Sequence, residues 1–274
     1  MKKIVYFLFA FILLIFGQVK GQNNQQTEIC IIANPHSNTK YYNSNVLDSI
    51  LNKINPDLIL VELDSSFFTS DFNYDTVKYS SLSITKSKSP NIIGTTLYKK
   101  HHKKVQIRPF DITGRNDSLK KNNYFDLKDK MYYDIYKYEK DDTISERNYR
   151  DYILLAKSLY AINSLNIETL KQMNSNVLTN LMFLQQSVYL NSALNIAETT
   201  DSLLKYKSFA HWQSDFWERR NNKMVENILY FIRKNQYERI VVLTGNMHKF
   251  YILYGLKKEK KDSDKYLIKE FWDY

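Results

Sequence analysis

Four polar side chains in this chain follow short apolar segments, and their types suit metal binding or acid–base chemistry. Two are histidines and two are carboxylates: His36 after residues 29–33, Glu62 after 58–61, Asp111 after 105–107, and His248 after 239–243. Imidazole and carboxylate groups bind divalent ions such as zinc, and they also act as general acids and bases. Brought together, they would form one site of two imidazoles and one or two carboxylates.

A structural role is the alternative for each of these four residues. A polar side chain at the end of a strand often caps a neighbouring helix or hydrogen-bonds a loop carbonyl. Taken singly, each residue is explained in that way. Two histidines at matched positions in similar units bring the functional interpretation level with the structural one, because perturbed ionisable groups gather at functional sites, and both stay open.

The apolar segments that precede these residues are typical of buried parallel strands. Residues 28–33 and 58–61 are short apolar runs, and between them Val46, Ile50 and Ile54 recur at helical spacing. A strand, a helix and a second strand in this order favour parallel pairing through a right-handed crossover. In such sheets ligands bind beyond the carboxyl ends of the strands, which is where the four polar residues are expected.

The end of the chain repeats this pattern. A helix over 224–234 is followed by a buried strand over 239–243, a further helix, and a strand-like segment over 266–272. Gly245 is expected to let the backbone turn sharply as the strand ends, so that His248 faces the site. The predicted fold is therefore α/β, with duplicated β-α-β units that form a largely parallel central sheet.

The middle of the chain is expected to be helical. Between residues 115 and 244 there is neither glycine nor proline, which argues for helices with few tight turns. We predict an all-helical insertion over about 115–215, packed over the sheet. Arg220 lies near the start of the helix expected from Met224, where its guanidinium would bind a carboxylate or phosphate. The neighbouring Arg219 is expected to face solvent.

The first residues predict export. Two lysines, an apolar stretch over 4–16 and a small-residue exit at 19–21 have the layout of a signal peptide over residues 1–21. Its removal would leave a single periplasmic or secreted domain over 22–274. No later segment is long and apolar enough to predict a membrane span. The only cysteine, Cys30, excludes a disulfide framework.

The charge pattern argues against a nucleic-acid partner. The formal net charge of the whole chain is +10, and without the three lysines of residues 1–21 it is +7. The basic residues are spread among acidic ones rather than gathered in an arginine-rich groove. We expect a small-molecule or peptide substrate instead, and the sequence leaves the oligomeric state open.

Four short motifs resemble those of the TraB/Tiki family, which includes GumN-type bacterial proteins. They are Ala33-Asn-Pro-His36, Pro56-Asp-Leu-Ile-Leu-Val-Glu62, Arg220-Asn-Asn-Lys-Met224 and Gly245-Asn-Met-His248, and they lie at both ends of the chain. The resemblance implies a duplicated α/β fold that is shared more remotely with erythromycin-esterase-like and ChaN-like haem-binding proteins. It also implies metal-dependent protease activity, with His36, Glu62 and His248 as metal ligands or catalysts.

The chain departs from the family pattern at two positions. Ala33 stands where the family has its first glycine, and Arg219 stands where a glutamate often precedes the Arg-Asn pair. Because of these departures, a third hypothesis stays open, in which the protein is inactive and only presents its surface to a partner.

Two functional hypotheses follow. In the leading one the protein is an exported metal-dependent hydrolase, in which His36, Glu62 and His248 hold a divalent ion and Arg220 orients an anionic substrate group. The alternative is a non-catalytic ligand-binding protein, for haem or another apolar ligand, with an aromatic lid supplied by the helical insertion.

Overall fold

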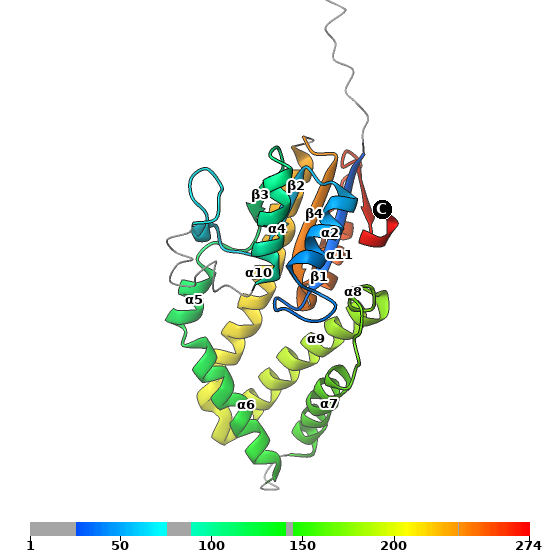
Figure 1. The fold of residues 1–274 in the computed structure, drawn as a ribbon. Coiled ribbons are helices and arrows are strands. Elements are labelled where there is room, and N and C mark those ends of the chain that lie inside the picture. The colour runs from blue at the N-terminus through cyan, green and yellow to red at the C-terminus, as the bar shows by residue number, and fades with distance from the viewer. Residues whose placement is uncertain (1–25, 76–88, 141–144, 235) are drawn as a thin grey trace, which may run out of the picture.

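Five short segments, most of them apolar runs, form an all-parallel sheet (Figure 1). The computed structural model describes residues 26–75, 89–140, 145–234 and 236–274, so the signal peptide predicted over 1–21 lies outside the described residues. The strands are β1 (Thr27–Asn34), β2 (Leu58–Val61), β3 (Gln106–Pro109), β4 (Arg239–Gly245) and β5 (Tyr266–Lys269). Their order across the sheet is β3-β2-β4-β1-β5. The predicted α/β class with a parallel central sheet is confirmed.

Helices cover both faces of the sheet. They are α2 (Ser44–Ile54) and α4 (Pro90–His101) on one face, and α10 (Lys207–Arg233) and α11 (Asn246–Lys258) on the other. Alternate side chains of β1 point to opposite faces: Cys30 and Ile32 pack with α2 and α4, whereas Ile29 and Ile31 pack with α10 and α11. Because both faces are buried, the strands are apolar without the alternation of a half-exposed sheet.

Two strand–helix–strand units interleave in this sheet. In the unit β1-α2-β2 the two strands are separated by β4, and in the unit β4-α11-β5 they are separated by β1. The helices of the two units lie on opposite faces. A rotation of 180° about an axis that runs parallel to the strands, between β1 and β4, would therefore exchange the positions of the two units. The segments that carry His36 and His248 leave adjacent strands at the same edge of the sheet.

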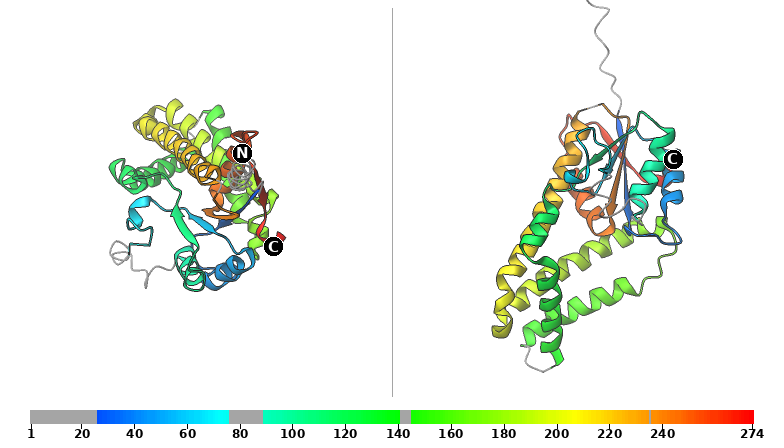
Figure 2. Two further views of the ribbon diagram at one scale, coloured as in Figure 1. Left: turned by 90° about the horizontal axis from the view of Figure 1, so that it is seen from above. Right: turned by 60° about the vertical axis from the view of Figure 1, so that its left-hand side comes forward.

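The helical region extends beyond the carboxyl ends of the strands, as Figure 1 and Figure 2 show. It comprises α5 (Arg115–Lys121), α6 (Tyr124–Lys140), α7 (Glu146–Asn163), α8 (Leu170–Met173), α9 (Asn176–Thr199) and η2 (Asp201–Tyr206). It has an apolar core of its own, in which Met131 and Ile135 pack with Ile196, Leu203 and Phe209. The expectation that it packs over the sheet is corrected, because most of it forms a separate lobe with that core.

Helix α10 joins this lobe to the sheet without a break. We expected a helix from about Met224, but α10 begins at Lys207 and runs for 27 residues. No glycine or proline interrupts the helix, so nothing ends it between the lobe and the sheet. Arg220 therefore lies in the middle of a long helix and not near its start.

Three element boundaries also differ from the prediction. The third strand begins one residue late and includes Pro109, which an edge strand tolerates. The last strand ends at Lys269 and is followed by η3 (Phe271–Asp273). In the segment after β2, η1 (Ser65–Phe67) forms a short helix, and residues 76–88 lie outside the described residues. Among the described helices, none combines the length and apolarity needed to cross a membrane.

Candidate functional site

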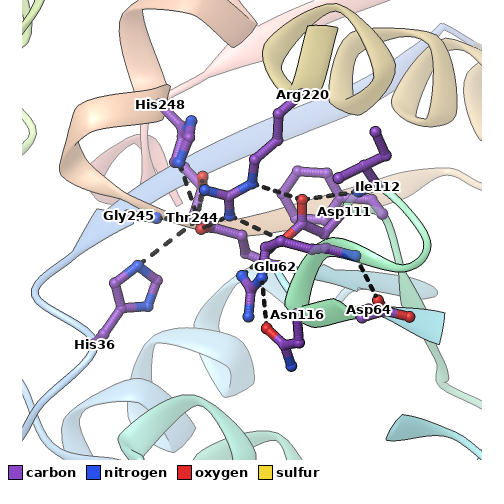
Figure 3. A network of polar contacts seen from close by, with 12 residues as sticks. His36, Glu62, Asp64, Asp111, Ile112, Asn116, Arg220, Thr244, Gly245 and His248 are labelled. Carbon is purple, nitrogen blue, oxygen red and sulfur yellow. Dashed lines mark hydrogen bonds and ion pairs between the residues drawn. The ribbon is translucent and has the colours of Figure 1, made fainter. Parts of the chain in front are cut away.

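Glu62 is the centre of a buried polar cluster at the carboxyl edge of the sheet (Figure 3). Its Oε1 accepts a hydrogen bond from Nη2 of Arg220 at 2.6 Å. Its Oε2 accepts hydrogen bonds from Oγ1 of Thr244 at 2.9 Å and from the backbone N–H of Gly245 at 2.6 Å. Burial raises the pKa of Glu62, but His248, Arg220 and the other groups around it outweigh this effect and hold the pKa well below its usual range. Glu62 is therefore a carboxylate at neutral pH.

His248 lies in the first turn of α11 and is almost fully buried, with 4% of its surface exposed. Its Nδ1 lies 2.7 Å from Oδ1 of Asn221, and Nδ2 of the same amide donates to the carbonyl of Trp217 at 3.0 Å. Because the Asn221 oxygen can only accept, Nδ1 of His248 carries the proton. Burial lowers the pKa of His248 to about 4, so the neutral ring presents an unprotonated Nε2.

That unprotonated nitrogen faces a carboxylate oxygen. Nε2 of His248 lies 3.5 Å from Oε1 of Glu62. The indole of Trp217 stacks on a face of the imidazole, with 4.5 Å between ring centroids. The ring of His248 is thus fixed by a hydrogen bond at one nitrogen and by stacking on its face, while its second nitrogen points at Glu62.

His36 approaches Glu62 from the other histidine-bearing loop. Its Nε2 lies 3.7 Å from Oε2 of Glu62, and half of its side chain is exposed. Its backbone has a φ of 59°, and its N–H donates to Oδ1 of Asn34 at 3.0 Å. The structure therefore brings His36, Glu62 and His248 together, one histidine beside each carboxylate oxygen.

Gly245 is required by this approach of His36. A Cβ added at this position would lie 2.4 Å from Nε2 of His36. The backbone of Gly245 has a φ of −65° and a ψ of 150°, which any residue adopts. The chain does turn from β4 into α11 at Gly245, but this turn does not require the conformational freedom of glycine. It is the lack of a side chain that the site needs.

Arg220 is held inside the protein by two carboxylates. Its Nε and Nη2 donate to the two oxygens of Asp111, each at 2.8 Å, in addition to the bond from Nη2 to Glu62. Asp111 also accepts from Nη1 of Arg115 at 2.8 Å, and Asp64 accepts from the backbone N–H of Arg115 at 3.0 Å. The carboxylate that we expected Arg220 to bind is thus supplied by the chain itself.

The charges of this cluster leave an excess of one negative charge. The carboxylates of Glu62, Asp64 and Asp111 contribute three negative charges, and the guanidinium groups of Arg115 and Arg220 contribute two positive ones. The imidazole of His248 is neutral at neutral pH. A cation is therefore the ligand that the electrostatics of the cluster favour.

The side chains of the three predicted metal ligands lie close together, but they do not yet enclose a metal ion. In the described ranges no three histidine, cysteine or acidic side chains meet in the arrangement that encloses a metal ion. Ligands bound at about 2.0–2.2 Å around zinc lie about 3–3.5 Å from one another in tetrahedral geometry. The pair of His248 and Glu62 has nearly that separation, and His36, with its half-exposed side chain, is slightly farther away.

Sequence reasoning missed Asn221 as the orienting partner of His248 and Trp217 as its stacking partner. These two residues lie at i and i+4 on α10, and Arg220 lies beside them at i+3. This spacing was the available signal, because it places all three on one face of a helix.

Comparison of the chain with protein-family models, with functionally characterised proteins and with solved structures finds no significant match. The resemblance to TraB/Tiki proteins therefore rests on the four motifs, and the function argued below rests on the geometry of the site.

Proposed function

We propose that the protein is a metal-dependent hydrolase whose divalent cation is held by Glu62, His248 and His36. The observation that carries the proposal is the 3.5 Å approach of two hydrogen-bond acceptors, Nε2 of His248 and Oε1 of Glu62. The proton of the imidazole is on Nδ1, toward Asn221. Arg220 offsets the charge of Oε1 from one side, but it does not donate to Nε2 of His248. A cation bound by both lone pairs would remove the repulsion that remains between them.

The surrounding residues support a preorganised ligand set. Thr244 and Gly245 hold one oxygen of Glu62, Arg220 holds the other, and Asn221 fixes the ring of His248. Such outer partners orient metal ligands and raise their affinity for the ion. His36 is half exposed, so it can turn toward an ion and leave one side of the site open to substrate.

A bound divalent ion would supply an activated water and would polarise the carbonyl or phosphoryl oxygen of a substrate. The protein's own residues perform the remaining tasks. Glu62 stays ionised because of the charges around it, and the buried, neutral His248 stays a lone-pair donor at neutral pH. Arg220 keeps Glu62 in place, and its bidentate bond to Asp111 anchors it independently of any substrate.

Metal titration of the purified chain tests this proposal without requiring a known substrate. Calorimetry with zinc and with manganese should show one site per chain, and His248→Ala should weaken binding by about 100-fold or more. His36→Ala should weaken binding as well, and because that side chain is half exposed the variant should fold normally. His211→Ala is the matched control, because His211 is exposed in the lobe and pairs with Glu198. Absence of binding, or equal binding by all three variants, would overturn the proposal.

A non-catalytic ligand-binding protein is the second candidate. A groove of about 1210 Å³ lies between α9, α10 and α11, and its aromatic lining includes Phe183, Trp217, Phe250, Tyr251 and Tyr254. This lining favours an apolar ligand. No histidine is among the described residues that line the groove, so a haem bound there would lack an imidazole ligand. A haem titration without a Soret shift would count against the haem version of this candidate.

Export remains part of the proposal. The segment 1–21 has the layout of a signal peptide. N-terminal sequencing of the protein recovered outside the cytoplasm should begin at Gln22, and an intact Met1 on that protein would contradict cleavage.

A further inference from the structure

A second cavity, of about 640 Å³, borders the Glu62 cluster through Arg220. It lies where α5 and the start of α6 approach α9 and α10. Its apolar wall is made by Leu119, Tyr124, Phe125, Leu190 and Phe216. A volume of this size is within the range of about 300–1,000 Å³ that small-molecule sites occupy.

The polar wall of this cavity carries positive charge. Arg115, Lys120 and Arg220 line it, and no acidic side chain lines it among the described residues. Both arginines are paired with Asp111, but Nζ of Lys120 has no ion pair within the described ranges. The neighbouring groove of about 1210 Å³ differs, because Glu218, Glu226 and Glu259 line it together with basic residues. Of these two cavities, the smaller one is lined by basic but not by acidic side chains, and Lys120 supplies its unpaired charge.

One buried hydrogen-bond donor in this wall lacks an acceptor among the described residues. It is Nε1 of Trp217. A buried donor without an acceptor destabilises a protein, and native structures rarely keep one without a reason. Because Trp217 lines the cavity, an oxygen of a ligand bound there is a candidate acceptor for this N–H.

We propose that this cavity binds a carboxylate that carries an apolar body, either aliphatic or aromatic. The carboxylate would pair with Lys120 and accept from Nε1 of Trp217, and the apolar body would lie against Leu119, Phe125 and Phe216. Because Arg220 belongs both to the cavity wall and to the Glu62 cluster, such a ligand would end beside the proposed metal site. The claim that this ligand is the substrate, or part of the substrate, rests on the hydrolase proposed above. The claim that the cavity binds the ligand does not.

Calorimetry on the whole chain, in a chelator and without added metal, tests the binding. The probes are phenylbutyrate and phenylbutanol, which share the apolar body and differ in the carboxylate. Phenylbutyrate should bind about tenfold more tightly, and added salt should weaken its binding. Lys120→Ala should remove most of this difference, while Lys121→Ala, on the same helix but outside the cavity wall, should keep it. Equal affinity for the two probes, or no binding of either, would overturn the proposal.

Trp217→Phe tests the unpaired donor directly. The variant removes the N–H and keeps an aromatic ring beside His248. Its affinity for phenylbutyrate should fall, and unchanged affinity would contradict the role given to this donor. A zinc titration on the same samples distinguishes the two proposals, because a chain that binds phenylbutyrate but no metal would refute the hydrolase and keep the carboxylate site.

Discussion

Asn221 and His248 join α10 to α11 through a hydrogen bond of 2.7 Å between Oδ1 and Nδ1, and this bond decides which nitrogen of the imidazole is free. Replacing the amide by a side chain of similar volume, Asn221→Leu, should release the ring and allow the other tautomer. We expect the affinity for zinc to fall by about 10- to 100-fold, as is usual for partners of metal-binding histidines. Calorimetry measures the change.

Asn222→Leu is the matched control, because Asn222 is the next residue of α10 and is exposed. It should bind zinc like the unchanged chain. Equal affinities for the Asn221 and Asn222 variants would show that the tautomer of His248 does not matter for binding.

Arg220→Met should destabilise the fold. The change leaves the buried carboxylate of Glu62 without its guanidinium, while Asp111 keeps Arg115 and the backbone N–H of Ile112. Breaking a buried ion pair in this way costs about 3–5 kcal/mol. Chemical denaturation followed by circular dichroism measures the loss, and the exposed neighbour in Arg219→Met should change the free energy of unfolding by about 0.5 kcal/mol or less. Similar values for both variants would contradict the structural role of Arg220.

Gly245→Ala should displace His36 without straining the backbone. The new Cβ would lie 2.4 Å from Nε2 of His36, but the half-exposed imidazole can turn away into solvent. We therefore expect a thermal stability close to that of the unchanged chain, together with weaker zinc binding. In a His36→Ala background the same substitution should have no further effect on zinc affinity, and a further loss there would refute the steric explanation.

The pair of Asp264 and Arg233 should contribute to acid sensitivity far from the site. Hydrogen bonds from Arg233, with further help from the backbone of Lys261, lower the pKa of Asp264 below its ordinary value of 3.8. A lowered carboxyl pKa adds stability above the unfolded value, and this stability is lost as the pH falls through that value toward the folded one. Asp264→Asn should therefore remove about 1 kcal/mol at neutral pH, since Arg233 is partly exposed and the pair is partly screened.

Denaturation measured at a series of pH values between about 7 and 3 checks this expectation. The difference between Asp264→Asn and the unchanged chain should shrink as the pH falls below about 4. Asp262→Asn, at an exposed position in the same loop, should not show this dependence. A constant difference across the range would contradict the assignment.

The strands of this fold were predictable because burial on both faces leaves a simple mark in the sequence. The run Leu58–Val61 is apolar throughout and forms a strand with those same limits. The order of the strands left no such mark. β4 lies between β1 and β2, and this placement depends on two crossovers that pass over opposite faces of the sheet. Local periodicity carries no information about which strand is inserted between two others.

The candidate site was predictable in part for the same reason. His36, Glu62 and His248 each follow a strand, and parallel strands bring their carboxyl ends to one edge. Asn221 and Trp217 come instead from a helix that packs across the sheet, so their position depends on the tertiary packing of α10. The partner of Arg220 was missed because sequence alone does not distinguish a carboxylate of the protein from one of a substrate.

The central position of β4 also sets the order in which a growing chain can fold. β4 pairs with β1 on one side and with β2 on the other, and it begins only at Arg239. β2 also pairs with β3, but a nascent chain lacks the strand that joins this pair to β1 until nearly all of the chain has been synthesised. The many long-range contacts that then form together are typical of slow folding. The two halves of the sheet can therefore join only after β4 has been synthesised, late in the chain.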